Sequence, residues 1–200
     1  MNPAFYNFAK FSVWMLARIL WRARVYGTQN VPATGPLIVA CNHVSYLDPP
    51  ILGCLCPRPI SYMAKKELFV VPVLGGMIRA LGAYAVDREG SATSAIRRSL
   101  RVLDTGGVVG IFPEGRRNLT GDALPQTGVG LLAAYAQAPV VPACLRGTNR
   151  ALRLARISVA FGEPIAPPAG RKATRDDLAK FTGKIMKSID MLAERIGGNT

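Results

Sequence analysis

The chain has 200 residues, half of them hydrophobic, and its 25 Lys and Arg against 12 Asp and Glu give a formal net charge of +13. That length suits a single domain with one sizeable core, and it excludes a large multidomain architecture. The positive charge favours an anionic partner, such as nucleic acid, anionic lipid headgroups or a phosphorylated substrate, although a merely soluble basic protein is the plain alternative.

The first 26 residues form the first expected unit, an amphipathic helix at a membrane surface, ahead of a domain that spans residues 27–200. This segment is rich in aromatic and basic residues, and no acidic residue precedes Asp48. The uncharged stretch between Lys10 and Arg18 is much shorter than the about 20 apolar residues that a spanning helix needs. Aromatic and cationic side chains together suit a helix in the headgroup region, and the alternative is a helix packed on its own domain.

Short apolar runs of β-type composition then alternate with helical patterns. We expect strands at residues 36–42, 59–64, 82–87, 107–113, 139–146 and 157–162, and helices at 72–81, 91–104 and 126–137. Strands that are apolar throughout and separated by helices predict an α/β sheet covered on both faces. Pro142 lies within one run, which predicts that this strand ends there or lies at an edge.

The last segment has the pattern of a packing helix without chemistry. Thr174 and Asp177 have the spacing of a capping box at its start. Apolar residues then follow at helical spacing: Leu178, Phe181, Ile185, Ile189, Leu192 and Ile196.

The four cysteines have no CxxC spacing, and the only histidine in the chain is His43. A zinc site is therefore not expected, and we predict no metal at all. The cysteines are Cys41, Cys54, Cys56 and Cys144. We expect reduced thiols on the cytosolic side, acting mostly as small core residues.

The stretch CNHVSYLDPP places His43 at a strand exit, five residues before Asp48. An imidazole can abstract a hydroxyl proton near neutral pH when a carboxylate fixes its other nitrogen. Ser45 favours local turning and Pro49 restricts the chain after Asp48, so the acid can reach back to the ring. The spacing alone does not distinguish this catalytic pair from a histidine that is a satisfied polar group in the core.

Two further strand exits carry charged residues. In FPEGRRN, Gly115 separates Glu114 from Arg116 and Arg117, which could grip a phosphate through forked hydrogen bonds. A solvated charged turn is the alternative interpretation. The pair Asp87 and Arg88 follows another short run and, taken alone, has the pattern of a surface ion pair.

Covalent catalysis is disfavoured because no serine lies in a GxSxG elbow and no cysteine has a second histidine to serve it. Cys41 adjoins the candidate pair, but its place within an apolar strand predicts a buried, inert thiol. The chain also lacks the glycine patterns GxxxxGK[ST] and GxGxxG that bind nucleotide phosphates.

In combination, these blocks resemble the glycerolipid acyltransferase family. NHVSYLD is similar to its NHxxxxD motif, FPEGRRN to its FPEGTRS motif, YAVDR to the intervening block that ends in arginine, and VVPACLR to its proline-containing fourth block. The order and separations also fit, from about Val31 to Gly162, and the most similar members are the 1-acyl-sn-glycerol-3-phosphate acyltransferases. The resemblance implies a single α/β domain with a mixed, largely parallel sheet flanked by helices.

The resemblance also implies a function. His43 would deprotonate the acceptor hydroxyl with Asp48 orienting it, and the hydroxyl would attack an acyl thioester of acyl-CoA or acyl carrier protein without any cofactor. The substrate-binding residues would be Asn42, Arg88, Phe112, Pro113, Glu114, Gly115, Arg116 and Arg117. The acceptor would be a lysophospholipid, and the enzyme would sit as a monotopic protein on the anionic cytoplasmic face of the plasma membrane.

Two positions depart from the family pattern: Arg116 replaces a threonine, and Gln126 replaces the usual lysine. These changes leave open another acceptor, such as a lyso-ornithine lipid. A basic nucleic-acid-binding module is the alternative outside the enzymes, but only the charge favours it, because the arginines are scattered and form no recognisable binding motif. We therefore expect no nucleic-acid partner.

Overall fold

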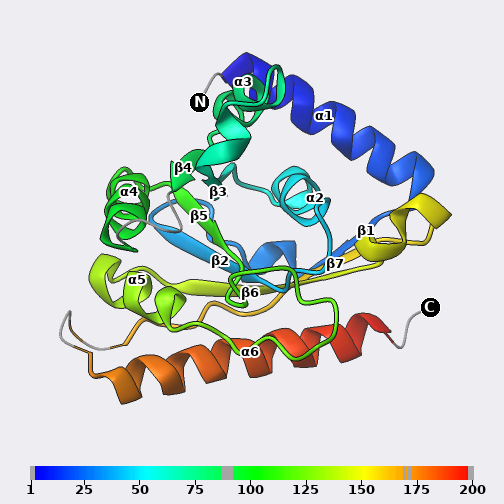
Figure 1. Ribbon diagram of the computed structural model, residues 1–200. Coiled ribbons are helices and arrows are strands. Elements are labelled where there is room, and N and C mark those ends of the chain that lie inside the picture. The colour runs from blue at the N-terminus through cyan, green and yellow to red at the C-terminus, as the bar shows by residue number, and fades with distance from the viewer. Residues whose placement is uncertain (1–2, 87–91, 169, 171–172, 198–200) are drawn as a thin grey trace.

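One sheet organises the molecule. The computed structural model describes residues 3–86, 92–168, 170 and 173–197. The described residues form a seven-stranded sheet of order β1-β7-β6-β2-β5-β3-β4, in which β6 and β7 are antiparallel and the other neighbours are parallel (Figure 1). The strands are β1 (Arg24–Tyr26), β2 (Leu37–Cys41), β3 (Ile60–Lys65), β4 (Tyr84–Val86), β5 (Val108–Ile111), β6 (Val140–Arg146) and β7 (Ser158–Phe161). The predicted α/β domain with a mixed, largely parallel sheet is confirmed.

Helices cover both faces of the sheet. α1 (Pro3–Leu20) and α2 (Asp48–Leu55) pack on one face, and α4 (Ala92–Asp104), α5 (Gly128–Ala136) and α6 (Arg175–Gly197) pack on the other (Figure 1). The connections contain the short helix α3 (Leu74–Ala80) and the 3-10 segments η1 (Thr28–Asn30), η2 (Lys66–Phe69) and η3 (Thr148–Arg153). All five residues of β2 are buried and alternate between the two cores, which explains why its sequence is apolar throughout.

The carboxyl-terminal helix α6 confirms the capping prediction. The Asp177 carboxylate accepts a hydrogen bond from the Thr174 amide at 3.0 Å, and the Asp177 amide donates to the Thr174 hydroxyl at 3.2 Å. This reciprocal pair satisfies amide groups that the first turn of a helix leaves without a partner. The six apolar residues that follow at helical spacing are all buried, and all but Leu178 belong to the core between α6 and the sheet.

The expectation drawn from Pro142 is wrong, because β6 continues through it and lies third in the sheet, between β7 and β2. The pairing with the β7 side shifts at this point. Ala143 faces Phe161, but Val140 faces Ile165, so the partner chain carries one extra residue between the two pairs. A residue without an amide proton is tolerated where the ladder is interrupted in this way.

The amino-terminal segment is not helical over all of residues 1–26. α1 ends at Leu20, and Arg24–Tyr26 form β1 beside β7. Arg22 has a φ of +46°, outside the right-handed helical region, which turns the chain away from the helix axis. Val25 and Tyr26 then favour an extended strand.

α1 is held against the domain by one stripe of side chains. Tyr6 and Ala17 are buried, the Tyr6 hydroxyl donates to the Gly53 carbonyl at 3.3 Å, and the Lys10 ammonium donates to the Cys56 carbonyl at 2.8 Å. Seven large apolar side chains of this helix are exposed: Phe8, Phe11, Trp14, Met15, Leu16, Ile19 and Leu20. Within the part of the chain that the structure describes, no helix is long and apolar enough to cross a membrane.

Candidate active site

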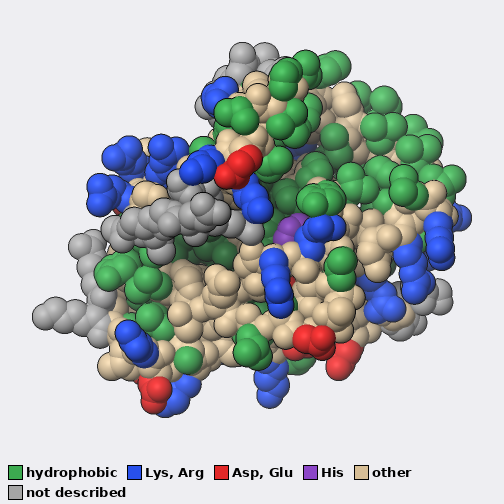
Figure 2. All heavy atoms as spheres, viewed as in Figure 1, with side chains coloured by type: hydrophobic (Ala, Val, Ile, Leu, Met, Phe, Trp, Pro, Cys, Tyr) green, Lys and Arg blue, Asp and Glu red, His purple; other side chains and the backbone are tan. Residues whose placement is uncertain are grey.

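Two neighbouring parallel strands bring the candidate residues together. β2 ends at Cys41 and β5 ends at Ile111, and the two strands pair in parallel along their length. Their carboxyl ends therefore meet at the same edge of the sheet, where α/β folds place their ligands. Figure 2 shows the single histidine beside a hollow on this face, with Lys and Arg side chains around it. The residues that follow the two strands form the site.

His43 and Asp48 form a direct pair. His43 Nδ1 lies 2.9 Å from Asp48 Oδ2, and the Asp48 side chain is fully buried while that of His43 remains 17% exposed. Engaging Nδ1 leaves Nε2 as the ring nitrogen that can take a proton from a substrate. The geometry predicted from the spacing is therefore present in the structure.

The first turn of α2 explains why Asp48 can reach back. Asp48 is the first residue of this helix, and prolines occupy the next two positions, where a missing amide proton has no consequence. Asp48 Oδ2 accepts the Val44 and Ser45 amides, each at 2.7 Å, in addition to the imidazole. Three donors and the positive end of α2 stabilise a negative charge at the carboxylate that holds the imidazole.

Phe112 sets the orientation of the imidazole plane. Its ring stacks on His43 with centroids 4.3 Å apart and an interplanar angle of 27°. The Tyr62 ring also stacks on Phe112, with centroids 6.1 Å apart and an interplanar angle of 12°. The histidine ring is thus held at one edge by Asp48 and on one face by an aromatic wall, which leaves it little freedom to rotate.

Glu114 is bound to the backbone of His43. The Glu114 side chain is buried, and its Oε2 accepts the His43 amide at 2.8 Å, while the Asn118 amide donates to the His43 carbonyl at 2.7 Å. Burial raises the pKa of Glu114, and the hydrogen bond from the His43 amide acts against this shift. The structure thus gives Glu114 a partner within the protein, and the loop after β5 fixes the backbone of His43.

Gly115 fits a tight turn that no other residue type would fit as well. Its φ is +68°, and its amide donates to the Phe112 carbonyl at 2.9 Å. A Cβ here would lie 2.6–3.0 Å from the side chain of Gln126. The backbone amide of Gln126 donates to the Pro113 carbonyl at 2.8 Å. Gln126, the residue that departs from the family pattern, therefore packs directly on the glycine of the loop.

Arg117 is held by an aromatic residue within the NHVSYLD block. Its guanidinium carbon lies 3.7 Å from the centroid of the Tyr46 ring, and Nη2 donates to the Tyr46 hydroxyl at 2.9 Å. The neighbouring Arg116 is exposed. Both cations thus project from the loop beside the His43–Asp48 pair, and Tyr46 defines where one of them lies.

Asn42 has a structural partner. Its side-chain amide donates to the Leu145 carbonyl at 3.0 Å, and its carbonyl accepts the Leu145 amide at 2.7 Å. This pair joins the end of β2 to β6 and fixes the backbone from which His43 projects. A substrate contact of Asn42 therefore stays a prediction, and Arg88 lies outside the described residues.

All four cysteines are free and buried, as expected for core residues. Burial raises the pKa of Cys41 well above its usual range, and the neighbouring Cys144 adds to this effect. The Cys41 thiol is therefore protonated at neutral pH and is a poor nucleophile, although it immediately precedes Asn42.

Sequence reasoning missed three partners of the site: Tyr46, Asn118 and Leu145. Tyr46 lies at a variable position of the motif, and its contact with Arg117 depends on where two separate loops meet. Asn118 and Leu145 act through backbone groups, which leave no mark in the sequence pattern. The helix α2 was also missed, although an acid followed by two prolines and an apolar run is typical of a helix start.

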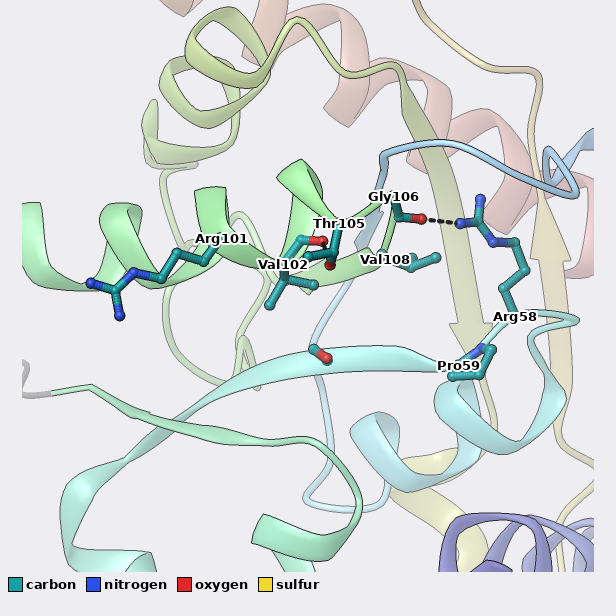
Figure 3. A pocket seen from close by; sticks show the side chains of 9 residues that line it. Arg58, Pro59, Arg101, Val102, Thr105, Gly106 and Val108 are labelled. Carbon is teal, nitrogen blue, oxygen red and sulfur yellow. Dashed lines mark hydrogen bonds between the residues drawn. The ribbon is translucent and has the colours of Figure 1, made fainter. Parts of the chain in front are cut away.

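A cavity of about 450 Å³ lies at the opposite end of the sheet, at the amino ends of β3 and β5. The Arg58 guanidinium at its rim donates to the carbonyls of Pro32, Gly35 and Gly106 at 2.7–2.9 Å. Figure 3 shows that Arg101 extends away from the other lining residues. The lining has no His, Cys, Asp or Glu, so this cavity does not carry the chemistry.

Comparisons with known proteins give the family of the chain. The acyltransferase family model matches residues 22–146. The chain is 33% identical over 197 residues to the 1-acyl-sn-glycerol-3-phosphate acyltransferase of Bacillus subtilis, covering 96% of this chain and 98% of that protein. It is 32% identical over 143 residues to the protein of that name from Borreliella burgdorferi, covering 70% of this chain and 56% of that protein.

A solved structure supports the fold. The 1-acyl-sn-glycerophosphate (LPA) acyltransferase PlsC from Thermotoga maritima aligns with a TM-score of 0.75 at 22% identity, covering 96% of this chain and 81% of that one. At that identity the likeness concerns the architecture. The family model covers more than half of this chain, and the Bacillus relative matches nearly all of it. The chain therefore belongs to the acyltransferase family and is an acyltransferase enzyme.

Proposed function

We propose that the protein transfers a fatty acyl group from acyl-CoA or acyl carrier protein to the sn-2 hydroxyl of 1-acyl-glycerol-3-phosphate, which gives phosphatidic acid. The observation that carries the proposal is the 2.9 Å contact between His43 Nδ1 and the buried Asp48 carboxylate, beside a loop that presents two arginines. The names of the relatives support the choice of acceptor.

The proposed reaction needs one base and no covalent intermediate. His43 Nε2 takes the proton of the acceptor hydroxyl as its oxygen attacks the carbonyl carbon of the thioester. The carbon–sulfur bond then breaks, and the departing thiolate takes the proton back from the imidazolium. Asp48 accepts hydrogen bonds from the imidazole and two amides, and in this proposal it orients the ring and stabilises its transient positive charge.

In this proposal, the acceptor phosphate binds at the loop after β5. Arg117 and Arg116 supply the charge, and guanidinium groups form paired hydrogen bonds with phosphate oxygens. Tyr46 accepts a hydrogen bond from Arg117, so its own proton can be donated to a phosphate oxygen. Contacts from Arg88 and Asn42 to the substrate remain part of the proposal.

The enzyme would work at the cytoplasmic face of the plasma membrane, held there by α1. The support is the exposed apolar face of this helix together with the exposed Arg18 and the net charge of +13. Deleting the helix would also remove the buried Tyr6 and Ala17, so point variants are the better test. Phe11→Asp and Ile19→Asp should reduce co-sedimentation with anionic vesicles, and binding equal to that of the wild type would contradict α1 as the anchor.

The decisive experiment is a panel of acceptors and donors with the purified full-length protein. 1-Oleoyl-lysophosphatidic acid, a lysophosphatidylcholine and a lyso-ornithine lipid are each presented with oleoyl-CoA or oleoyl acyl carrier protein, and the products are identified by mass spectrometry. We expect phosphatidic acid to be the main product. Strong preference for the phosphate-free acceptor would replace the proposed acceptor, and salt-sensitive DNA binding without acyl transfer would overturn the function.

A further inference from the structure

The connection between β3 and β4 exposes a second group of apolar side chains. We call it the valine ridge, and its members are Leu68, Val70, Val71, Val73 and Met77. Val70 and Val73 are 81% and 88% exposed, and they lie between η2 and α3. Large apolar side chains grouped in this way indicate an interaction surface, whereas single exposed ones do not.

Backbone hydrogen bonds fix the conformation of the ridge. The Leu74 amide donates to the Pro72 carbonyl at 2.7 Å, which closes a tight turn around Val73 at a φ of +65°. The amides of Gly75 and Met77 donate to the carbonyls of Val71 and Val73, both at 2.9 Å. Such a turn is rare and strained for a β-branched residue, and it points the valines outward on a hydrogen-bonded backbone.

Cationic side chains flank the ridge. Lys65 and Arg79 are exposed, and Arg79 lies over the Phe69 ring with its guanidinium carbon 5.3 Å from the centroid. Glu67 is the acidic residue of the same segment. Apolar tips with cations at their base are typical of segments that enter the headgroup region of an anionic membrane.

The ridge also lies on the same side of the molecule as α1. Figure 1 places α3 and the amino-terminal part of α1 together at the upper end of the molecule, and Figure 2 shows hydrophobic side chains gathered along that upper edge. One flat surface can therefore touch both elements. A net charge of +13 disfavours the stacking of two copies and favours an anionic surface.

We propose that the valine ridge is a second membrane-contact element, which inserts into the headgroup region of an anionic bilayer beside α1. The inference rests on the proposed lipid acceptor. A single helix at an interface leaves the protein free to roll about the helix axis, whereas a second contact off that axis fixes its orientation. The ridge thus holds the hollow beside His43 at a constant angle to the membrane from which the acceptor comes.

The experiment uses the full-length protein and unilamellar vesicles of equal parts phosphatidylcholine and phosphatidylglycerol. The double variant Val70→Asp/Val73→Asp should lower the vesicle partition coefficient by roughly tenfold or more, because it replaces apolar insertion with charge. The matched control is Leu124→Asp/Met191→Asp, at exposed positions outside the ridge, which adds the same charge and should give a clearly smaller decrease. Equal decreases in the two double variants would overturn the ridge as a contact.

A second measurement reports insertion directly. The four native cysteines are buried, so a Val70→Cys variant can be labelled selectively with an environment-sensitive fluorophore. We expect a blue shift of its emission on addition of the anionic vesicles and no shift for an equally labelled Leu124→Cys variant. An unchanged emission at position 70 would overturn the proposal, as would a ridge that mediates self-association in sedimentation velocity without vesicles.

The ridge and the proposed function can fail separately. The Asp double variant should keep the activity of the wild type on a short-chain lysophosphatidic acid below its micellar concentration, while losing activity on vesicle-bound acceptor. Loss of activity on both substrates, with vesicle binding intact, would overturn the ridge. Absence of acyl transfer in the wild type would contradict the proposed function. The vesicle and fluorescence results would still decide whether the ridge contacts the membrane.

Discussion

The two ends of the sheet each carry an arginine beside a glycine-containing turn. At the carboxyl end, Arg117 stacks on the exposed Tyr46 ring and donates to its hydroxyl. At the amino end, Arg58 donates to three backbone carbonyls beside a cavity of about 450 Å³. The first guanidinium lies on the surface of a loop next to the His43–Asp48 pair, and the second joins the loops that precede β2 and β5.

The two ends differ in the hydrogen-bonding capacity that they leave available for a substrate, and the proposed function rests on this difference. The amino-end cavity has no His, Cys, Asp or Glu in its lining, and the Arg58 guanidinium at its rim already donates to three backbone carbonyls. The carboxyl end brings together His43, a buried carboxylate and a cation within reach of solvent. We therefore assign the proposed chemistry to the carboxyl end and a stabilising role to the amino end, and the predictions below test this division.

The largest expected effect is the loss of the base. His43→Ala should lower kcat by roughly 10²–10⁴-fold, because no other histidine in the chain can take the proton of the acceptor hydroxyl. Steady-state kinetics with saturating donor and acceptor measure it. Thermal unfolding of the same variant is the control, since Asp48 keeps its two amide donors. A variant that folds and retains near wild-type kcat would contradict the assignment of His43 as base.

At the other end of the sheet, Arg58→Met should affect stability and leave kcat nearly unchanged. The variant keeps much of the apolar stem and loses three hydrogen bonds from a charged group, so we expect the free energy of unfolding to fall by about 1–3 kcal/mol. Urea denaturation followed by circular dichroism measures the change. Arg101→Met is the matched control at the same cavity and should stay within about 0.5 kcal/mol. A large loss of kcat at unchanged stability would make the amino-end cavity a functional site.

The architecture was largely predictable because buried parallel strands leave a strong signal. The apolar runs around β2 and β5 match strands whose residues are all buried. NHVSYLD and FPEGRRN each follow a predicted strand. Because the carboxyl ends of parallel strands share an edge of the sheet, the two motifs could be expected to lie close together. The His43–Asp48 pair follows from the same reasoning and a local turn.

The sequence did not reveal features that depend on contacts between separate loops. Glu114 binds the amide of His43, and Arg117 stacks on Tyr46. Both contacts form because β2 pairs with β5 in a register that brings the loops after the two strands together. The prediction that the strand containing Pro142 ends there or lies at an edge was wrong for a similar reason. A proline predicts an interrupted ladder, but the shift in pairing on the β7 side accommodates it within a central strand.

Glu114 should make stability depend on pH at the carboxyl end of the sheet. Burial raises its pKa, so between the ordinary value and the raised one the folded protein binds a proton that the unfolded chain has released. The stabilising contribution is complete below that window and is lost as the pH rises through it, with a slope of at most about 1.4 kcal/mol per pH unit.

The test is a comparison of the wild type with Glu114→Gln, which retains an oxygen that can accept the His43 amide. Urea denaturation at intervals between about pH 4 and about pH 7 should show the stability of the wild type falling relative to that of the variant as the pH rises. Glu163→Gln, an exposed acid after β7, is the control and should show no such relative slope. Parallel curves for the wild type and Glu114→Gln would contradict a raised pKa.

The smallest expected effect concerns Tyr46, and it tests whether the stack on Arg117 serves the acceptor phosphate. Tyr46→Phe keeps the ring and loses the hydroxyl, and Tyr46→Leu loses both. A cation–π contact at an exposed site contributes about 0.5–1 kcal/mol, so KM for lysophosphatidic acid should rise by about two- to fivefold in the Leu variant at nearly constant kcat.

Tyr135→Phe, at another exposed tyrosine on α5, should leave both constants unchanged. The change in KM should vanish with an acceptor that lacks phosphate, because Arg117 then has no anion to bind. An equal rise in KM for both acceptors would mean that Tyr46 only supports the fold of its loop, and the contrast between Arg117 and Arg58 would lose its functional meaning.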